Sequence, residues 1–126
     1  MIGIDILENE RIKERLAKPE FMKMFMTDYE QKYVSTYTDI TQRVTGIFCV
    51  KEAIKKAFGC PEKMGFKDME IRHYENGKPF VIFDKSLEII VGSKVVEISI
   101  SHSNTVTVAV CIVFNTDCTC EDDECH

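Results

Sequence analysis

The sequence has no long hydrophobic run, since none of its apolar segments reaches the roughly 18 residues that a helix needs to cross a bilayer. Its N-terminus, Met-Ile-Gly-Ile-Asp-Ile, lacks the basic segment, apolar stretch and cleavage site of a signal peptide. It also lacks internal repeats, linkers and low-complexity blocks before its last residues. These absences predict one domain with a single core, in the cytoplasm and without a membrane partner.

The chain also lacks a positive charge excess. Its formal net charge is −5, and the segment 115–126 holds five acids and no Lys or Arg. The remainder carries 16 basic and 16 acidic residues. A neutral body gives no general reason to bind nucleic acid, so no nucleic-acid partner is expected, and any electrostatic partner requires a local patch.

The six cysteines do not form the two close pairs of a zinc site. We interpret Cys49 and Cys111, which lie in apolar segments, as small core residues in a reducing compartment. Three more cysteines and His126 crowd into the last residues, which form either a disordered tail or a soft-metal site. We therefore divide the chain into a domain at 1–114 and an acidic, Cys-rich tail at 115–126, which we expect to be disordered.

Local patterns predict an α+β fold with mainly antiparallel pairing. Hydrophobic periodicity, the capping box that starts at Thr27, and the helix-ending Gly59 set the helices of the first half. β-branched runs and the Asn76-Gly77 turn set the strands of the second half. The expected strands are 1–6, 69–74, 79–83, 95–101 and 105–114; the expected helices are 8 to about 16, 21–25, 27 to about 35, Thr41 or Thr45 to 59, and 85–91.

Two stretches carry acids that are candidates for chemistry. Asp5 interrupts an apolar strand, and alternation puts it on the face opposite Ile4 and Ile6. It is either an exposed or salt-bridged acid at a sheet edge, or a ligand for a hard cation. Glu52 and Lys56 are four residues apart on one helical face. They form either a surface ion pair or a site with Glu52 on a metal and Lys56 on a phosphate.

A third stretch, Ser99-Ile100-Ser101-His102-Ser103, runs from a strand into a turn. Hydroxyls, backbone N–H groups and an imidazole suit phosphate oxygens, although a histidine at a strand end is also commonly structural or merely exposed.

Together these stretches resemble the holo-acyl-carrier-protein synthases, the small stand-alone members of the 4'-phosphopantetheinyl transferase superfamily. The resemblance covers residues 1 to about 114. The matching residues are Asp5, Ile6, Arg11 and Ile12; Phe48, Lys51, Glu52, Ala53, Lys56, Ala57 and Gly59; Phe66, Asp68, Met69 and Glu70; Asn76, Gly77, Lys78 and Pro79; and Ser99, Ser101, His102 and Ala109.

The resemblance implies a reaction in which a serine of apo-acyl carrier protein takes the 4'-phosphopantetheine group of coenzyme A, releasing adenosine 3',5'-bisphosphate. It implies that Asp5 and Glu52 bind Mg²⁺ against the pyrophosphate of coenzyme A, as part of fatty acid biosynthesis. It further implies that Lys56 supports the phosphates. The residues implied near the adenosine end are Ser101, His102 and Ser103.

The resemblance also implies partners. Arg11, Arg15 and Lys18 form a local basic stripe on a neutral body, suited to steering an acidic acyl carrier protein, although the same stripe could be an ordinary solvated helix face. Family members form homotrimers with active sites between subunits, so a homotrimer is expected by analogy.

Two segments depart from the family pattern. Ile47 stands where the family often has an arginine that helps to hold coenzyme A, and Arg43 lies one helical turn earlier. The loop 59–65, Gly-Cys-Pro-Glu-Lys-Met-Gly, is stiffer and more charged than the family's glycine-rich loop. These changes leave open a non-catalytic protein that binds coenzyme A or the carrier. The tail cysteines separately leave open a metal-binding or redox-sensing protein.

Overall fold

The computed structural model describes residues 1–116 and confirms the α+β fold with antiparallel strands. The predicted tail, apart from its first two residues, lies outside this range. Within residues 1–116 no helix has the length and hydrophobicity needed to span a membrane. The elements are β1 (Ile2–Glu8), α1 (Asn9–Arg15), α2 (Phe21–Phe25), α3 (Asp28–Val34), α4 (Thr41–Phe58), η1 (Pro61–Lys63), η2 (Phe66–Asp68), β2 (Met69–His73), β3 (Pro79–Phe83), η3 (Lys85–Leu87), α5 (Glu88–Val91), β4 (Val95–His102) and β5 (Val106–Phe114).

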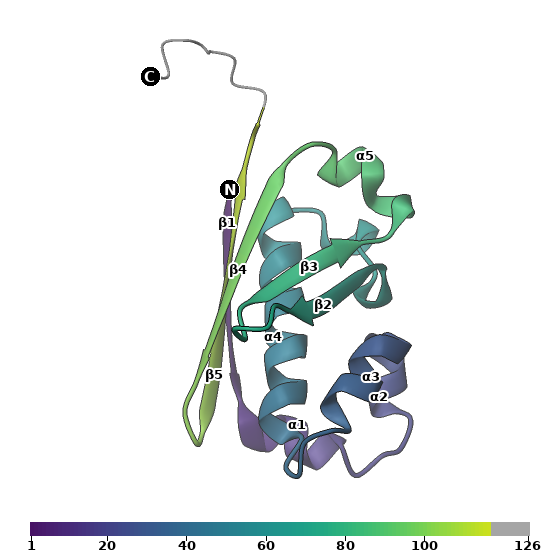
Figure 1. The fold of residues 1–126 in the computed structure, drawn as a ribbon, viewed down its shortest axis with the longest axis vertical. Coiled ribbons are helices and arrows are strands. Elements are labelled where there is room, and N and C mark those ends of the chain that lie inside the picture. Colours follow the sequence, from purple (N-terminus) through teal and green to yellow (C-terminus); the bar gives the residue numbers. More distant parts are fainter. Residues whose placement is uncertain (117–126) are drawn as a thin grey trace.

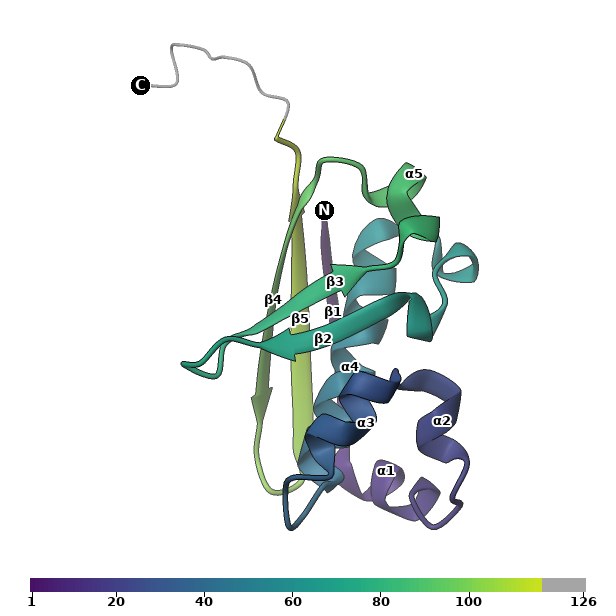
Figure 2. The ribbon, with the colours of Figure 1, turned by 45° about the vertical axis from the view of Figure 1, so that its right-hand side comes forward.

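Two antiparallel sheets surround the long helix α4. A three-stranded sheet has the order β1-β5-β4, and β2 and β3 form a separate hairpin. Helix α4 runs along one face of the larger sheet, with α1, α2 and α3 gathered near its N-terminal end and α5 at the opposite end (Figure 1). Figure 2 shows the hairpin beside α4 on the side away from β1.

Local signals set the ends of the helices. The side chain of Thr27 accepts a hydrogen bond from the Glu30 N–H, and Glu30 accepts one from the Thr27 N–H, so the predicted capping box starts α3. Helix α4 begins at Thr41, the earlier of its two candidate starts. It ends at Gly59, whose φ of 75° is the left-handed conformation that glycine adopts most easily.

Strand β1 lies unusually close to α4 because small residues face each other. A Cβ atom on Gly3 would lie only 2.1 Å from the backbone oxygen of Ala53 and 2.5 Å from the backbone nitrogen of Ala57. Glycine is therefore the residue that permits this contact. This close approach fixes the position along α4 that Asp5, two residues further along β1, contacts.

The larger sheet has one buried face and one exposed apolar face. Ala109, Cys111 and Val113 of β5 point toward α4 and are almost fully buried. On the other face, Ile2, Ile4 and Ile6 of β1 keep 67%, 60% and 65% of their surface exposed. Their partners across the ladder are Ile112, Val110 and Val108. The exposed face of this sheet is therefore apolar over β1 and β5, whereas β4 adds the polar residues Glu97, Ser99 and Ser101 to it.

The interior also confirms the interpretation of two cysteines. Cys49 and Cys111 are fully buried. Burial raises the pKa of the Cys49 thiol to about 12 and that of Cys111 to about 11. Both thiols are thus held neutral and behave as small core residues rather than as nucleophiles.

A buried ion pair joins the helices near the middle of α4. Lys51 Nζ donates to Glu30 Oε1 at 2.7 Å and to the backbone oxygens of Phe25 and Phe66 at 2.8 and 2.9 Å. Glu30 also accepts the backbone N–H of Ile71. Burial lowers the pKa of Lys51, and the Glu30 carboxylate opposes that shift. The pair connects α2, α3, α4, η2 and β2 in one hydrogen-bonded network.

Candidate functional site

The Asp5 side chain lies on the α4 side of the sheet, as alternation along the strand predicts. It pairs with Ala109 across the ladder and is 17% exposed. Its Oδ1 accepts a hydrogen bond from Lys56 Nζ at 3.1 Å, and the same ammonium donates to the Ile4 backbone oxygen at 3.1 Å. The Cys49 thiol donates to the Asp5 backbone oxygen at 3.2 Å. Asp5 is therefore fixed against α4 both by its side chain, through Lys56, and by its backbone oxygen, through Cys49.

Glu52 lies on the stretch of α4 that Asp5 meets. It follows Cys49 by three residues and precedes Lys56 by four, so the three side chains share one helical face. Glu52 is half-buried. The Lys56 ion pair in residues 1–116 is with Asp5 and not with Glu52, so the simple surface pair of Glu52 and Lys56 is absent. The fold thus brings Asp5 and Lys56 into contact from two distant segments, and Glu52 lies on the same face of α4 as Lys56.

The strand-end residues do not form one cluster. Ser101 pairs with Val108, on the exposed face of the sheet, whereas His102 pairs with Thr107, on the α4 face. Ser103 closes the turn to β5, because its Oγ accepts the backbone N–H groups of Thr105 and Val106 at 3.3 and 3.2 Å. Of the three, His102 is the one that lines a hollow on the α4 side.

That hollow has a volume of about 340 Å³ and lies between α3, α4, the β2–β3 hairpin and the end of β4. We call it the Arg43 hollow; its lining consists of Tyr33, Tyr37, Gln42, Arg43, Gly46, Ile47, His73, Gly77, Pro79, Ile100 and His102.

Aromatic and cationic groups are stacked in the Arg43 hollow. The guanidinium of Arg43 lies 4.2 Å from the Tyr37 ring centroid, and the Tyr37 and Tyr33 hydroxyls are 3.2 Å apart. Tyr33 stacks on His73 with centroids 4.6 Å apart and planes 12° from parallel. Burial and the Tyr37 hydrogen bond raise the pKa of Tyr33 to about 12. Burial and, secondarily, the charge of Arg43 lower the pKa of His73, whose buried Nδ1 has no hydrogen-bond partner among residues 1–116.

A second hollow lies beside the basic stripe. Arg11, Arg15 and Lys18 are all exposed, as predicted. Arg15 and Lys18 line a hollow of about 470 Å³ together with Glu14, Glu20, Phe21 and Met24. Arg15 lies 6.0 Å from the Phe21 ring centroid, and Met24 is 70% exposed. This surface, which we call the basic–apolar face, joins the exposed cations, two acids and an exposed apolar patch.

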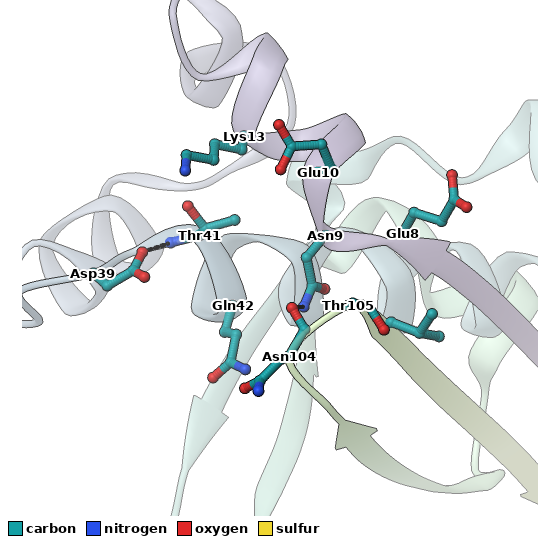
Figure 3. Close-up of a pocket in the computed structure, with 10 residues that line it drawn as sticks. Glu8, Asn9, Glu10, Lys13, Asp39, Thr41, Gln42, Asn104 and Thr105 are labelled. Carbon is teal, nitrogen blue, oxygen red and sulfur yellow. Dashed lines mark hydrogen bonds between the residues drawn. The ribbon is translucent and has the colours of Figure 1, made fainter.

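The most spacious of the described hollows, about 830 Å³, contains none of the predicted site residues. Figure 3 shows it between Glu10 and Lys13 of α1 and Gln42 and Asn104 opposite. Buried Asn9 at its base donates to the backbone oxygens of Ser103 and Asn104 at 3.0 and 3.2 Å. No local sequence pattern marks Asn9 as the anchor of the β4–β5 turn, because its partners lie more than 90 residues away.

Comparison with known proteins places the chain in a family. Residues 1–111 match the model of the 4'-phosphopantetheinyl transferase superfamily. The chain is 39% identical to the holo-[acyl-carrier-protein] synthase of Caldicellulosiruptor saccharolyticus, over 88% of this chain and 93% of that protein. It is 36% identical to that of Fusobacterium nucleatum, over 89% of this chain and 96% of that protein.

Comparison with solved structures supports the same family. The holo-(acyl-carrier-protein) synthase of Bacillus anthracis, in complex with CoA (3',5'-ADP), has a TM-score of 0.80 and 33% identity, covering 91% of this chain and 96% of that chain. The Helicobacter pylori synthase, in complex with coenzyme A, has a TM-score of 0.80 and 27% identity, covering 90% of this chain and 99% of that chain. The chain therefore belongs to the 4'-phosphopantetheinyl transferase superfamily and, within it, to the holo-[acyl-carrier-protein] synthases.

Proposed function

We propose that the chain transfers the 4'-phosphopantetheine group of coenzyme A to a serine of apo-acyl carrier protein in a Mg²⁺-dependent reaction that supplies fatty acid biosynthesis. The observation that supports the proposal is the contact of Asp5 on β1 with Lys56 on α4, with Glu52 one turn before Lys56 on the same helical face. A protein that only bound coenzyme A or the carrier would have no use for two carboxylates and an ammonium gathered in this way.

The donor set fits Mg²⁺. Asp5 already holds one cation, the Lys56 ammonium, at 3.1 Å, and Glu52 adds a second carboxylate on the adjoining helical face. Mg²⁺ is commonly bound through one or two carboxylates, with waters and substrate phosphates completing its octahedron. When bound there by Asp5 and Glu52, the ion would supply neutralisation of the charge that develops on the pyrophosphate.

The remaining work falls to side chains of the chain. Lys56, whose side chain is 56% exposed, can pivot on its four-carbon stem to hold phosphate oxygens. The carrier serine oxygen forms a bond to the β-phosphorus, and the bond from that phosphorus to the bridging oxygen breaks. The leaving group is adenosine 3',5'-bisphosphate, and the hydroxyl proton passes to water beside the carboxylates.

The basic–apolar face is the proposed docking surface for the carrier protein. Its exposed cations, Arg11, Arg15 and Lys18, would steer an acidic partner, and Met24 would bury apolar surface in the complex.

The catalytic unit is proposed to be a homotrimer with sites shared between subunits. Arg43 and Glu52 are nine residues apart on α4, which is about 2.5 turns, so they project from opposite faces of the helix. One coenzyme A molecule that contacts both the Arg43 hollow and the acidic pair would therefore span two copies of the chain. The exposed apolar face that contains Ile2, Ile4 and Ile6 offers the surface on which such copies would pack.

The test mixes the protein with coenzyme A, Mg²⁺ and apo-carrier protein, and measures the carrier mass. The proposal expects a phosphopantetheine-sized gain, lost when Mg²⁺ is chelated and in folded Asp5→Asn and Glu52→Gln variants. Glu88→Gln, which neutralises an exposed acid on α5, is the matched control and should keep full activity. A fully active Glu52→Gln would overturn the metal assignment, and an unmodified carrier with wild-type protein would overturn the function.

A further inference from the structure

Lys51 is a buried cation that the proposed chemistry does not use. Its side chain and that of its partner Glu30 have no exposed surface, so neither can touch a substrate. An ammonium group has three N–H donors, and Lys51 gives one of them to Glu30 Oε1 at 2.7 Å. The other two reach the backbone oxygens of Phe25 and Phe66 at 2.8 and 2.9 Å. Lys51 can therefore act on the reaction only through the segments that it holds.

One of these segments is the short helix α2. It is five residues long, too short to be stable alone in water, and no side chain of residues 1–116 caps its N-terminus. Phe25 is its last residue, and the final carbonyl groups of a helix have no partner within that helix. Lys51 supplies this partner from α4, and the ring centroids of Phe25 and Phe48 lie 5.0 Å apart. Helix α2 is thus attached to a single turn of α4, residues 48–51.

The exposed side of α2 belongs to the basic–apolar face, where the carrier protein is proposed to dock. Phe21 and Met24 line its hollow, and the ring centroids of Phe21 and Phe25 are 5.1 Å apart. At the other end of the contact, Lys51 is followed directly by Glu52, one of the two proposed metal ligands. The Lys51 ammonium therefore links the docking helix to the turn of α4 that carries the acidic site. Helix α1, by contrast, continues directly from β1 and is tied to that site through the main chain.

We infer that Lys51, paired with Glu30, is a positioning residue that fixes α2 against α4 and so aligns a docked carrier protein with the acidic site. This inference rests on the proposed function and refines it. The carrier serine must reach the β-phosphorus of coenzyme A, and a misplacement of about 1 Å can slow a reaction about 100-fold. Glu30 balances the buried charge, and the N–H groups of Thr27 and Ile71 hold its carboxylate in place.

The test uses the double variant Lys51→Met/Glu30→Gln, because Lys51→Met alone leaves a buried carboxylate unpaired. In conditions where the double variant is folded, its kcat/KM for the carrier protein should fall about 10- to 100-fold. Its KM for coenzyme A and its Mg²⁺ dependence should stay as in wild type, because β1 still holds α4. Leu87→Ala is the matched control: it removes buried volume directly before α5, so it should lower stability and leave kcat/KM unchanged.

Hydrogen–deuterium exchange of the free protein provides a readout that needs neither carrier nor turnover. The double variant should exchange the backbone N–H groups of residues 21–26 faster than wild type while β1 and β5 stay protected, and Leu87→Ala should not show this local change. A folded double variant with wild-type kcat/KM for the carrier, or with unchanged exchange in α2, would show that the inference is wrong while the transferase function stands. If wild type fails to modify the carrier, the proposed function is wrong and the inference falls with it.

Discussion

Replacing Gly3 by Ala tests whether the contact between β1 and α4 sets the position of the acidic pair. The added Cβ would lie 2.1 Å from the Ala53 oxygen and 2.5 Å from the Ala57 nitrogen. Both atoms belong to the backbone of a buried helix and cannot turn aside as a side chain could. The strand and the helix must separate, by about 1 Å to reach ordinary contact.

The magnitude follows from this geometry. Overpacking typically costs about 1–3 kcal/mol, and collision with helix backbone puts Gly3→Ala near the upper end, at about 3 kcal/mol. Asp5 lies two residues along the same strand and its backbone oxygen is bonded to Cys49, so it moves when the strand moves. A misplacement of about 1 Å at a reacting centre can lower the rate about 100-fold.

Two measurements check this: urea denaturation followed by circular dichroism, and the transfer rate in conditions where the variant is folded. Gly46→Ala is the stability control, because its Cβ would lie 3.5 Å from the Ile100 side chain, an ordinary contact. In the interior of α4 this change should be neutral or stabilising by up to about 1 kcal/mol. A Gly3→Ala protein with wild-type unfolding free energy and rate would refute the close packing of β1 on α4.

Four further substitutions give distinct outcomes. Lys51→Met should lower the free energy of unfolding by about 3–5 kcal/mol because it leaves the buried Glu30 carboxylate unpaired, and adding Glu30→Gln should recover part of this loss; strictly additive effects in denaturation would contradict the pair. The pKa of His73 lies below 6.5 in the folded state, so the unfolded chain binds more protons as pH falls through 6.5 and stability declines there. His73→Phe should weaken this decline below about pH 6.5, and an unchanged stability profile would exclude His73 as its source. Arg15→Glu should raise KM for the carrier protein about tenfold, more at low salt, with KM for coenzyme A unchanged; equal effects on both would argue against a docking role. Ile4→Glu should shift light scattering from trimer toward monomer, and an unaltered mass would exclude the apolar sheet face as the interface.

Helix and strand limits could be predicted where the signal is local. The Thr27 capping box and Gly59 act through atoms a few residues away, and both mark helix ends in the structure. The position of Asp5 opposite Ile4 and Ile6 also followed from the two-residue period of a strand.

Side-chain contacts between residues that are far apart in sequence have no such local signal. The four-residue spacing of Glu52 and Lys56 is compatible with a helical ion pair, but Lys56 instead contacts Asp5, 51 residues away. Nothing near Lys51 in the sequence indicates that it is buried against Glu30, 21 residues earlier. Such partners depend on how β1, α3 and α4 pack, which a local pattern does not specify.

Strand alternation separates Ser101 from His102. The two are neighbours in sequence, but adjacent residues of a strand project to opposite faces of the sheet. Only His102 shares the α4 side with Asp5 and the Arg43 hollow. The role proposed for Ser101 near the adenosine end therefore requires the exposed face of the sheet to approach a ligand, which in the proposed trimer is where copies meet.

Helix α4 explains why the proposed site divides between subunits. Its Glu52 face receives β1 and the acidic chemistry, while the face that carries Arg43 opens to the aromatic hollow. A helix about 10 Å across separates the two, so the substrate cannot touch both on one chain without wrapping around it. Pairing the acidic face of one copy with the Arg43 hollow of another removes this conflict, and it makes catalysis depend on assembly. Mixing folded Glu52→Gln and Arg43→Met proteins, at a coenzyme A concentration too low to saturate Arg43→Met, should accordingly restore part of the wild-type activity, because some interfaces then combine two intact halves; mixtures no more active than their components would exclude a shared site.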